Sequence, residues 1–145
     1  MGYSLKIGDA FIEAGDYGDV SIQARSVTLE DAPAEGAPTD YSNSRWPSYT
    51  GWRCFADAVG ITPFMFRAED GVMPSFEGKD VLPLIDAHPG VTAITRTHYK
   101  AILAAITEYQ VSKNPHPYHL RRCDWLLFWL QWALANCTTP VFVNG

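Results

Sequence analysis

A dense group of polar and aromatic side chains between residues 43 and 52 is the first candidate for chemistry. Its members supply an amide, a guanidinium, hydroxyls and aromatic rings: Asn43, Arg45, Trp46, Ser48, Tyr49 and Trp52. Ser48 or Thr50 can also cap a helix. Helix N-termini attract anions, and a guanidinium beside aromatic rings can hold a phosphate and stack a base. The segment therefore predicts a nucleotide-type ligand site; the structural alternative is that Trp46-Pro47 and Tyr49 pack onto the core while Ser48 caps.

Two histidines are candidates to supplement this site. His88 lies in His88-Pro89-Gly90, and His98 follows Thr95-Arg96-Thr97. An imidazole donates or accepts hydrogen bonds near neutral pH, so both are expected ligand-binding residues. Combining either histidine with a Ser or Cys and an Asp gives a catalytic arrangement only at the level of chance, so the sequence predicts no catalytic residue.

The spacing of His116, His119 and Cys123 permits a zinc corner, because His119 and Cys123 would share one face of a helix. A fourth ligand is missing nearby, and Cys123 lies in an apolar segment. The acidic turn at 69–71 lacks the spacing of a calcium loop, and the glycines form neither a phosphate loop nor a dinucleotide fingerprint. We expect no metal and no cofactor.

Two β-strands are predicted near the N-terminus. Apolar residues alternate with polar ones from Tyr3 to Ile7 and from Val20 to Ala24, on either side of a turn-rich segment. This pattern is typical of an antiparallel hairpin. Residues 31–43 are rich in Pro, Gly, Ala, Asp and Ser and predict a long loop or arm, which is either a binding element or flexible filler.

Three helices are expected further along. A short one carries Trp52, Phe55 and Val59 on one face and ends at Gly60. Residues 61–90 favour loops with one short helix or turn. A second helix, capped by Thr95 or Thr97, runs to about Ser112, and a third runs from about Tyr118 to Asn136. Residues 138–143 predict a final short strand that could join the hairpin.

The last helix is apolar almost all round. Between Trp125 and Ala135 only Gln131 is strongly polar, and Trp125, Trp129 and Trp132 leave almost no solvent-facing side. The apolar run is too short to span a bilayer. The helix is therefore either the centre of the domain or part of an interface with a second copy, and these three tryptophans are the expected interface residues of a homo-oligomer.

Composition places the chain among packed globular proteins. Its 145 residues are 47% hydrophobic and 19% charged, which suits one domain over residues 1–145. The net charge of −5 disfavours broad binding to nucleic acids or anionic membranes. Without a signal-like or membrane-spanning segment, and with three widely spaced cysteines that suit free thiols, a cytoplasmic location is expected. The predicted fold class is α+β: a small sheet built on the N-terminal hairpin, packed against two longer C-terminal helices and one short helix.

Several short motifs of the chain resemble motifs of a known group of proteins. They are the opening Tyr-x-Leu-x-Ile-Gly, the segment from Asn43 to Trp52, His88-Pro89-Gly90 with Ile94-Thr95-x-x-His98, and Trp132-Ala133-Leu134-x-Asn136-Cys137-x-x-Pro140. Over most of its length the chain resembles a group of small uncharacterised proteins encoded in tailed-bacteriophage genomes. The resemblance implies action in the cytoplasm of an infected host and transfers no reaction and no site residue.

Two classes of function follow. One is an accessory protein that sequesters a nucleotide-type signal of host defence, using Arg45, Tyr49 and Trp52 for phosphate and base contacts. The other is an inhibitor or accessory factor that covers a host or phage protein through an exposed aromatic surface and the arm at 31–43, without a small ligand. A small hydrolase is a third possibility, for which the sequence offers no nucleophile and base to test.

Overall fold

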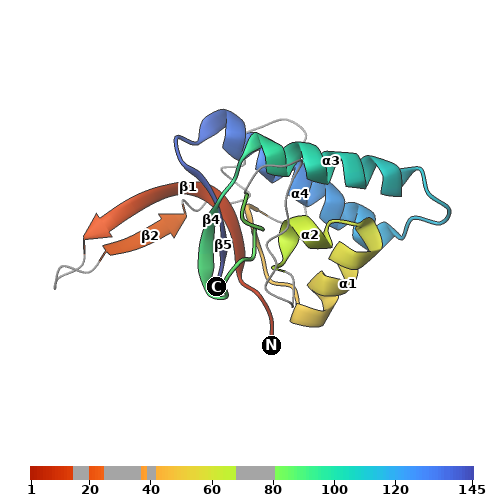
Figure 1. The fold of residues 1–145 in the computed structure, drawn as a ribbon, viewed down its shortest axis with the longest axis horizontal. Helices are drawn as coiled ribbons and strands as arrows, with labels where there is room; N and C mark the ends of the chain where they lie inside the picture. The colour runs from red at the N-terminus through yellow and green to blue at the C-terminus, as the bar shows by residue number, and fades with distance from the viewer. Residues whose placement is uncertain (15–19, 25–36, 39–41, 68–80) are drawn as a thin grey trace.

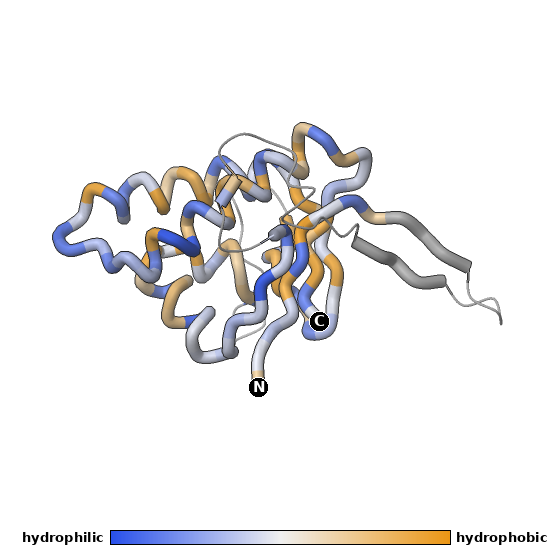
Figure 2. Tube along the Cα trace, turned by 180° about the vertical axis from the view of Figure 1, so that it is seen from behind, coloured by the Kyte–Doolittle hydropathy of each residue, from blue (hydrophilic) through white to orange (hydrophobic). Residues whose placement is uncertain are grey.

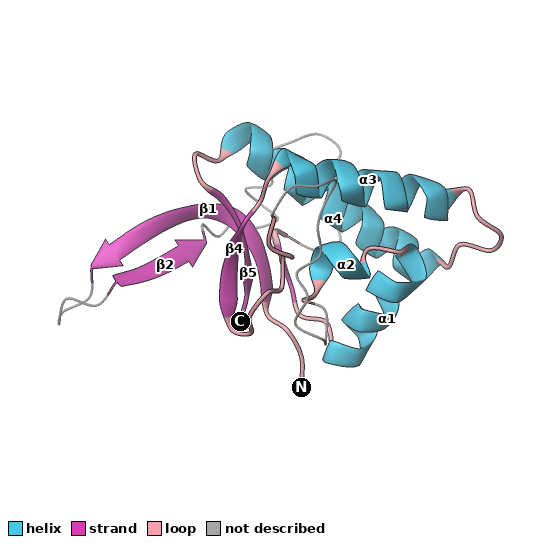
Figure 3. Cartoon of the chain, viewed as in Figure 1, coloured by secondary structure: helices cyan, strands magenta, loops and turns pink. Residues whose placement is uncertain are grey.

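A computed structural model describes residues 1–14, 20–24, 37–38, 42–67 and 81–145 of the chain. Four antiparallel strands lie in the order β2-β1-β5-β4, and a two-residue strand, β3, also pairs with β1. Their bounds are β1 Leu5–Ala14, β2 Val20–Ala24, β3 Ser44–Arg45, β4 Gly90–Ala93 and β5 Pro140–Asn144. Two longer C-terminal helices pack on this sheet, so the predicted α+β class is confirmed (Figure 3).

An antiparallel hairpin with Val20–Ala24 is present as predicted, but its first strand is the later part of β1 and not the predicted segment from Tyr3 to Ile7. The second half of β1, from Ala10 to Ala14, pairs with β2, and its first half pairs with β5 between Leu5 and Asp9. The hairpin extends beyond the rest of the sheet (Figure 1). The predicted final strand is β5, which lies between β1 and β4, so the last strand of the chain is central in the sheet.

Strand β4 falls where the sequence indicated no strand. Within it, Val91 is 39% exposed while Thr92 is only 7% exposed. The usual pattern of an apolar inner face and a polar outer face is thus reversed at these two positions, and four residues are too few for a period to show. Pairing with β5, not local sequence, defines this strand.

Four helices complete the described elements: α1 Tyr49–Val59, α2 Thr62–Met65, α3 Arg96–Gln110 and α4 Pro117–Asn136. The predicted ends are confirmed. The Ser48 hydroxyl accepts from the Gly51 amide at the start of α1, and Gly60 closes this helix with a φ of 85°. Thr95 caps α3, and Pro117 occupies the first turn of α4.

Apolar segments gather where the strands meet the helices (Figure 2). The buried cluster combines side chains of β1 and β5 with those of all four helices. Its largest fully buried members are Trp52, Trp125 and Trp129. Helix α4 therefore acts as the central helix of this core, which is the first of the two roles expected for it.

The predicted arm at 31–43 lies mostly outside the described residues. At its end, the Ser42 carbonyl accepts a 2.7 Å hydrogen bond from the Trp125 indole N–H, and Asn43 is fully buried. This end of the segment is therefore fixed to α4. No helix among the described parts of the chain is long and apolar enough to cross a membrane.

Candidate functional site

The polar-aromatic segment from Asn43 to Trp52 is divided by the fold into a buried and an exposed part. Asn43 is fully buried, and its side-chain amide donates to the Ile7 carbonyl at 2.6 Å. Arg45 is only 7% exposed, and its guanidinium carbon lies 5.8 Å from the centre of the Trp125 ring. Trp52 is fully buried. These three side chains are part of the packed interior. The structural alternative is correct for buried Pro47 and for Ser48 as cap, and wrong for Trp46, which is 68% exposed.

The exposed part consists of Trp46, Ser48 and Tyr49. Trp46 is 68% exposed, although the residues on either side of it, Arg45 and Pro47, are buried. Asn43, Ser44 and Arg45 are all buried, and burial alternates only after β3, where Trp46 and Ser48 are exposed on either side of the buried Pro47. Ser48 caps α1, and Tyr49 is half-buried in its first turn.

Tyr49 joins His88 across 39 residues of sequence. Its hydroxyl and the His88 Nε2 are 2.9 Å apart in a hydrogen bond. Tyr3 lies against both rings in edge-to-face contacts, with centroid distances of 4.7 Å to Tyr49 and 5.0 Å to His88. His88 itself is exposed. The predicted association of His88 with the 43–52 segment is therefore seen in the structure.

Tyr3 is a residue of this site that the sequence interpretation missed. The alternating pattern indicates only an apolar strand residue at this position, and Tyr3 is 6% exposed. Its backbone amide donates to the Pro47 carbonyl at 2.9 Å, so the N-terminal segment runs directly beside residues 46–48. The sequence signal that could have found it is weak, because an aromatic residue on an alternating strand is usually a core residue.

A shallow, open groove borders this aromatic group. It has a volume of about 440 Å³ and is lined by Met1, Gly2, Tyr3, Ser4, Trp46, Pro47 and Ser48. None of these lining side chains is charged. Tyr3 lines this groove with Trp46 and Ser48 and also contacts Tyr49 and His88. We call Trp46, Ser48, Tyr49 and His88, which Tyr3 links, the Trp46 surface. It can stack on apolar or planar groups and exchange hydrogen bonds, but Arg45 brings no charge to it.

His98 lies elsewhere and has a structural role, so its assignment to the ligand site is not supported. It is fully buried. The Thr95 backbone amide donates to its Nδ1 at 3.1 Å, and its Nε2 donates to the Leu82 carbonyl at 2.7 Å. Amides only donate and carbonyls only accept, so these partners fix the neutral Nε2–H tautomer. Burial lowers the pKa of His98, in keeping with a neutral ring.

The three tryptophans expected at a subunit interface are mostly covered within one chain. Trp125 and Trp129 are fully buried, and the Trp129 ring packs edge-on against the half-buried Trp132 at 5.3 Å. Most of the apolar surface of α4 is thus covered by the sheet and the other helices. An interface role does not fit Trp125 or Trp129, and only Trp132 retains exposed area.

The zinc corner considered for α4 does not form. Cys123 is buried, and burial together with the neighbouring Asp124 carboxylate raises the pKa of its thiol to about 12. The pKa of His119 is lowered by burial and by the nearby Arg122 and His116 cations. Among the described residues, no group of three or more His, Cys, Asp or Glu side chains could hold a metal ion.

Comparison of the chain with protein-family models, curated proteins and solved structures finds no match.

Proposed function

We propose that this protein is a binding protein that covers a protein partner through the Trp46 surface. The observation that carries the proposal is the exposure of Trp46, at 68%, on a groove it shares with Tyr3, which in turn contacts the hydrogen-bonded Tyr49–His88 pair. Tryptophan and tyrosine dominate the binding energy of protein interfaces because they bury a large area at low entropic cost. A shallow groove without charged side chains suits the side chains of a protein better than a nucleotide.

The same geometry weakens the nucleotide hypothesis. Of the three side chains expected to contact phosphate and base, Arg45 and Trp52 are buried in the core, and only Tyr49 reaches the surface. A phosphate at this surface would meet the first turn of α1 and no arginine of the 43–52 segment. Sequestration of a nucleotide-type signal is therefore the less supported of the two binding hypotheses.

The resemblance to small bacteriophage proteins bears on the source of the partner. If the chain is encoded by a phage, as the resemblance implies, the protein we propose is a phage accessory factor that acts on a host or phage protein in the host cytoplasm. The Trp46 surface does not depend on this context, because its recognition chemistry is set by the exposed indole and the Tyr49–His88 pair.

The test compares three forms of the full chain as bait: the wild type, Trp46→Ala and Val111→Ala. Val111 is 82% exposed in the loop after α3 and serves as a matched control for loss of exposed apolar area. A partner that uses the Trp46 surface is captured by the wild type and by Val111→Ala and lost with Trp46→Ala. With the purified partner, we expect Trp46→Ala to raise Kd by about 30-fold or more, equivalent to about 2 kcal/mol.

Two results would overturn the proposal. One is equal binding of the partner by the wild type and Trp46→Ala. The other is a rise of several degrees in Tm with a cyclic or linear nucleotide that Trp46→Ala and Tyr49→Phe abolish, since that would restore the nucleotide hypothesis at this surface.

A further inference from the structure

Strand β4 forms one edge of the sheet. Among the described strands it pairs only with β5 (Figure 1). The Ile94 amide donates to the Pro140 carbonyl at 2.9 Å, and this bond sets the phase of the pairing, because alternate residues of an antiparallel strand bond the same neighbour. Thr92 therefore bonds β5, and the backbone N–H and C=O groups of Val91 and Ala93 point away from it.

The outward groups of Val91 and Ala93 offer a place for another strand. They have no backbone hydrogen-bond partner among the described residues. Both side chains are exposed as well, Val91 at 39%. Natural sheets often protect an edge with a lysine, a proline or a bulge, and β4 contains neither a lysine nor a proline. Only an extended backbone can satisfy donors and acceptors that alternate in this way.

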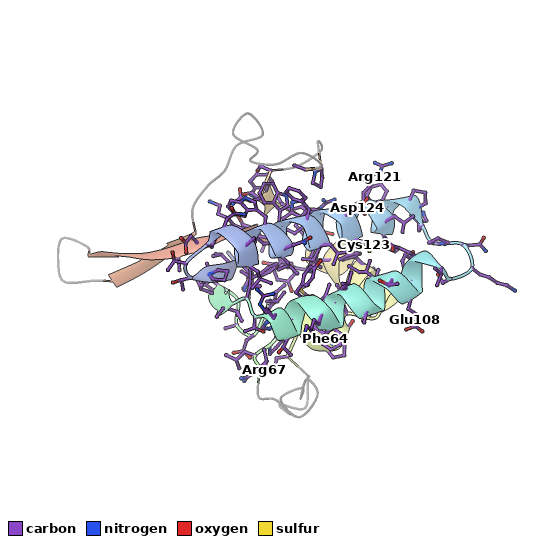
Figure 4. The ribbon with its side chains drawn as sticks, turned by 90° about the horizontal axis from the view of Figure 1, so that it is seen from above. Phe64, Arg67, Glu108, Arg121, Cys123 and Asp124 are labelled. Carbon is purple, nitrogen blue, oxygen red and sulfur yellow. The ribbon has the colours of Figure 1, made fainter. Side chains whose placement is uncertain are left out.

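The charge around this edge permits the approach of an identical strand. The chain carries a net charge of −5, so two copies repel each other in general. Residues 89–95, however, contain no charged side chain. Figure 4 shows Glu108, Arg121 and Asp124 on the two long helices, at the end away from the strands. Two copies can therefore meet at β4 without placing like charges opposite each other within this segment.

We propose that β4 pairs with β4 of a second copy in an antiparallel ladder centred on Thr92. The two-fold symmetry of this ladder places Val91 opposite Ala93 of the second copy, and the reverse. Each such pair exchanges two hydrogen bonds, so every outward N–H meets an outward C=O. The sheets of the two copies then form one continuous sheet.

The neighbouring residues select this register over its alternatives. A shift toward the N-terminus puts Val91 opposite itself and Ala93 opposite Pro89, which has no N–H to donate. A shift toward the C-terminus puts Val91 opposite Thr95, whose amide already donates to the His98 Nδ1 at 3.1 Å. Only the proposed register uses all the outward groups of both strands.

The first experiment measures the mass of the full chain by sedimentation equilibrium between about 10 µM and about 1 mM. The paired edge is short, so we expect a weak dimer with a Kd of about 100 µM. In ¹⁵N spectra over the same range, the amide signals of Val91 and Ala93 should shift with concentration. The Thr92 amide should shift less, because it already bonds β5.

Two edge variants test the pairing. Val91→Lys places a charge on the edge, and Ala93→Pro removes one outward N–H while leaving the ladder with β5 intact. Each should raise the Kd of the dimer by about ten-fold or more. The matched control is Val111→Lys, which adds the same charge at a position that is 82% exposed. This control and Trp46→Ala should dimerise like the wild type, because neither residue belongs to the edge.

Four results would each overturn the proposal. They are a wild type that stays monomeric at about 1 mM, a dimer whose formation leaves the Val91 and Ala93 amides unshifted, unchanged affinity in both edge variants, and equal weakening by Val111→Lys. The wild-type shifts keep the test decisive even if a variant unfolds. A monomer would leave the function proposed for the Trp46 surface untouched, since the two surfaces share no residue.

Discussion

At the scale of single residues, His98 shows how a polar side chain becomes part of the fold. Its ring spans the first turn of α3 and the carbonyl of Leu82, 16 residues earlier in the chain. Glutamate or glutamine is the usual residue at this position of a capping box, and here an imidazole takes it. The same residue type at position 88 is exposed, hydrogen-bonds the Tyr49 hydroxyl and lies edge-on to the rings of Tyr3 and Tyr49. Burial and partners, not residue type, separate the two roles.

His98→Ala should therefore destabilise the protein by about 2–4 kcal/mol. The change leaves a cavity and removes two hydrogen bonds, the one that the Thr95 amide donates to Nδ1 and the one that Nε2 donates to the Leu82 carbonyl. His88→Ala is the matched control and should change the free energy of unfolding by less than about 1 kcal/mol, because His88 is exposed. Urea denaturation at pH 7.5 measures both. Equal effects of the two substitutions would contradict the structural role of His98.

The depressed pKa of His98 also predicts a pH dependence. A histidine whose pKa is lower in the folded state binds fewer protons there than in the unfolded chain, so stability rises with pH. The full contribution is present above the unfolded pKa of about 6.5 and is lost as the pH falls below that value. His119, whose pKa is lowered in the same direction, adds to the effect.

We expect the urea concentration at the unfolding midpoint to decrease as the pH is lowered from 7.5 to 5. The decrease should be smaller in His98→Gln, because glutamine does not titrate. A midpoint that is flat over this range, or a wild-type slope that persists in His98→Gln, would show that His98 does not take up a proton on unfolding.

At the scale of elements, α1 depends on its two ends. It has only 11 residues, too few for an isolated helix to be stable in water. The Ser48 hydroxyl satisfies one amide of the first turn, and Gly60 lets the chain leave the helix through a left-handed conformation. Between these ends, Trp52, Phe55 and Val59 attach one face of the helix to the core. The N-terminal end of α1 also belongs to the Trp46 surface, through its cap Ser48 and its first residue Tyr49.

Gly60→Ala should lower the free energy of unfolding by about 1 kcal/mol. The cause would be backbone strain alone, because a Cβ at this position meets no atom within 4 Å. Gly60→Asn should cost less, since asparagine tolerates the left-handed region better. Thermal and urea unfolding of the two variants measure the difference. An alanine variant as stable as the wild type would contradict the left-handed conformation at Gly60.

At the scale of the whole molecule, α4 is the central helix of the core and packs against α1, α3, β1 and β5. The Trp125 ring contacts Trp52 of α1 edge-on at 6.2 Å, lies near the Arg45 guanidinium of β3, and donates to the Ser42 carbonyl. One side chain thus links helix, strand and the end of the 31–43 segment. The arrangement leaves Trp125 no surface to offer to a second copy.

Trp125→Phe should therefore destabilise the fold by about 2–3 kcal/mol without changing the oligomeric state. The loss combines one buried hydrogen bond with the smaller volume of the phenyl ring. Denaturant unfolding gives the stability, and sedimentation velocity of the folded variant gives the oligomeric state. Dissociation of an oligomer by Trp125→Phe would return this residue to an interface role.

Sequence patterns predicted the elements that depend on interactions between residues close together in the chain. Alternation predicted the hairpin, and cap residues predicted the ends of α1, α3 and α4 within one or two residues. The sequence did not predict strand β4, because Val91 is exposed and Thr92 is buried, the reverse of the usual pattern. Its pairing with β5 defines it as a strand. Of the candidate site, the pattern grouped both His88 and His98 with the 43–52 segment, and only His88 lies there, hydrogen-bonded to Tyr49. It could not separate exposed Trp46 from buried Arg45 and Trp52.

By itself, the sequence determined a mixed fold with an N-terminal hairpin and an apolar last helix, because the periodicity of side chains and the capping preferences act over a few residues. Only the tertiary structure decided which polar and aromatic side chains reach solvent. That choice depends on contacts between residues far apart in the chain: Arg45 over Trp125, His98 with Leu82, and Tyr49 with His88. Burial is a property of the packed elements, so a segment with one composition can hold both core and surface.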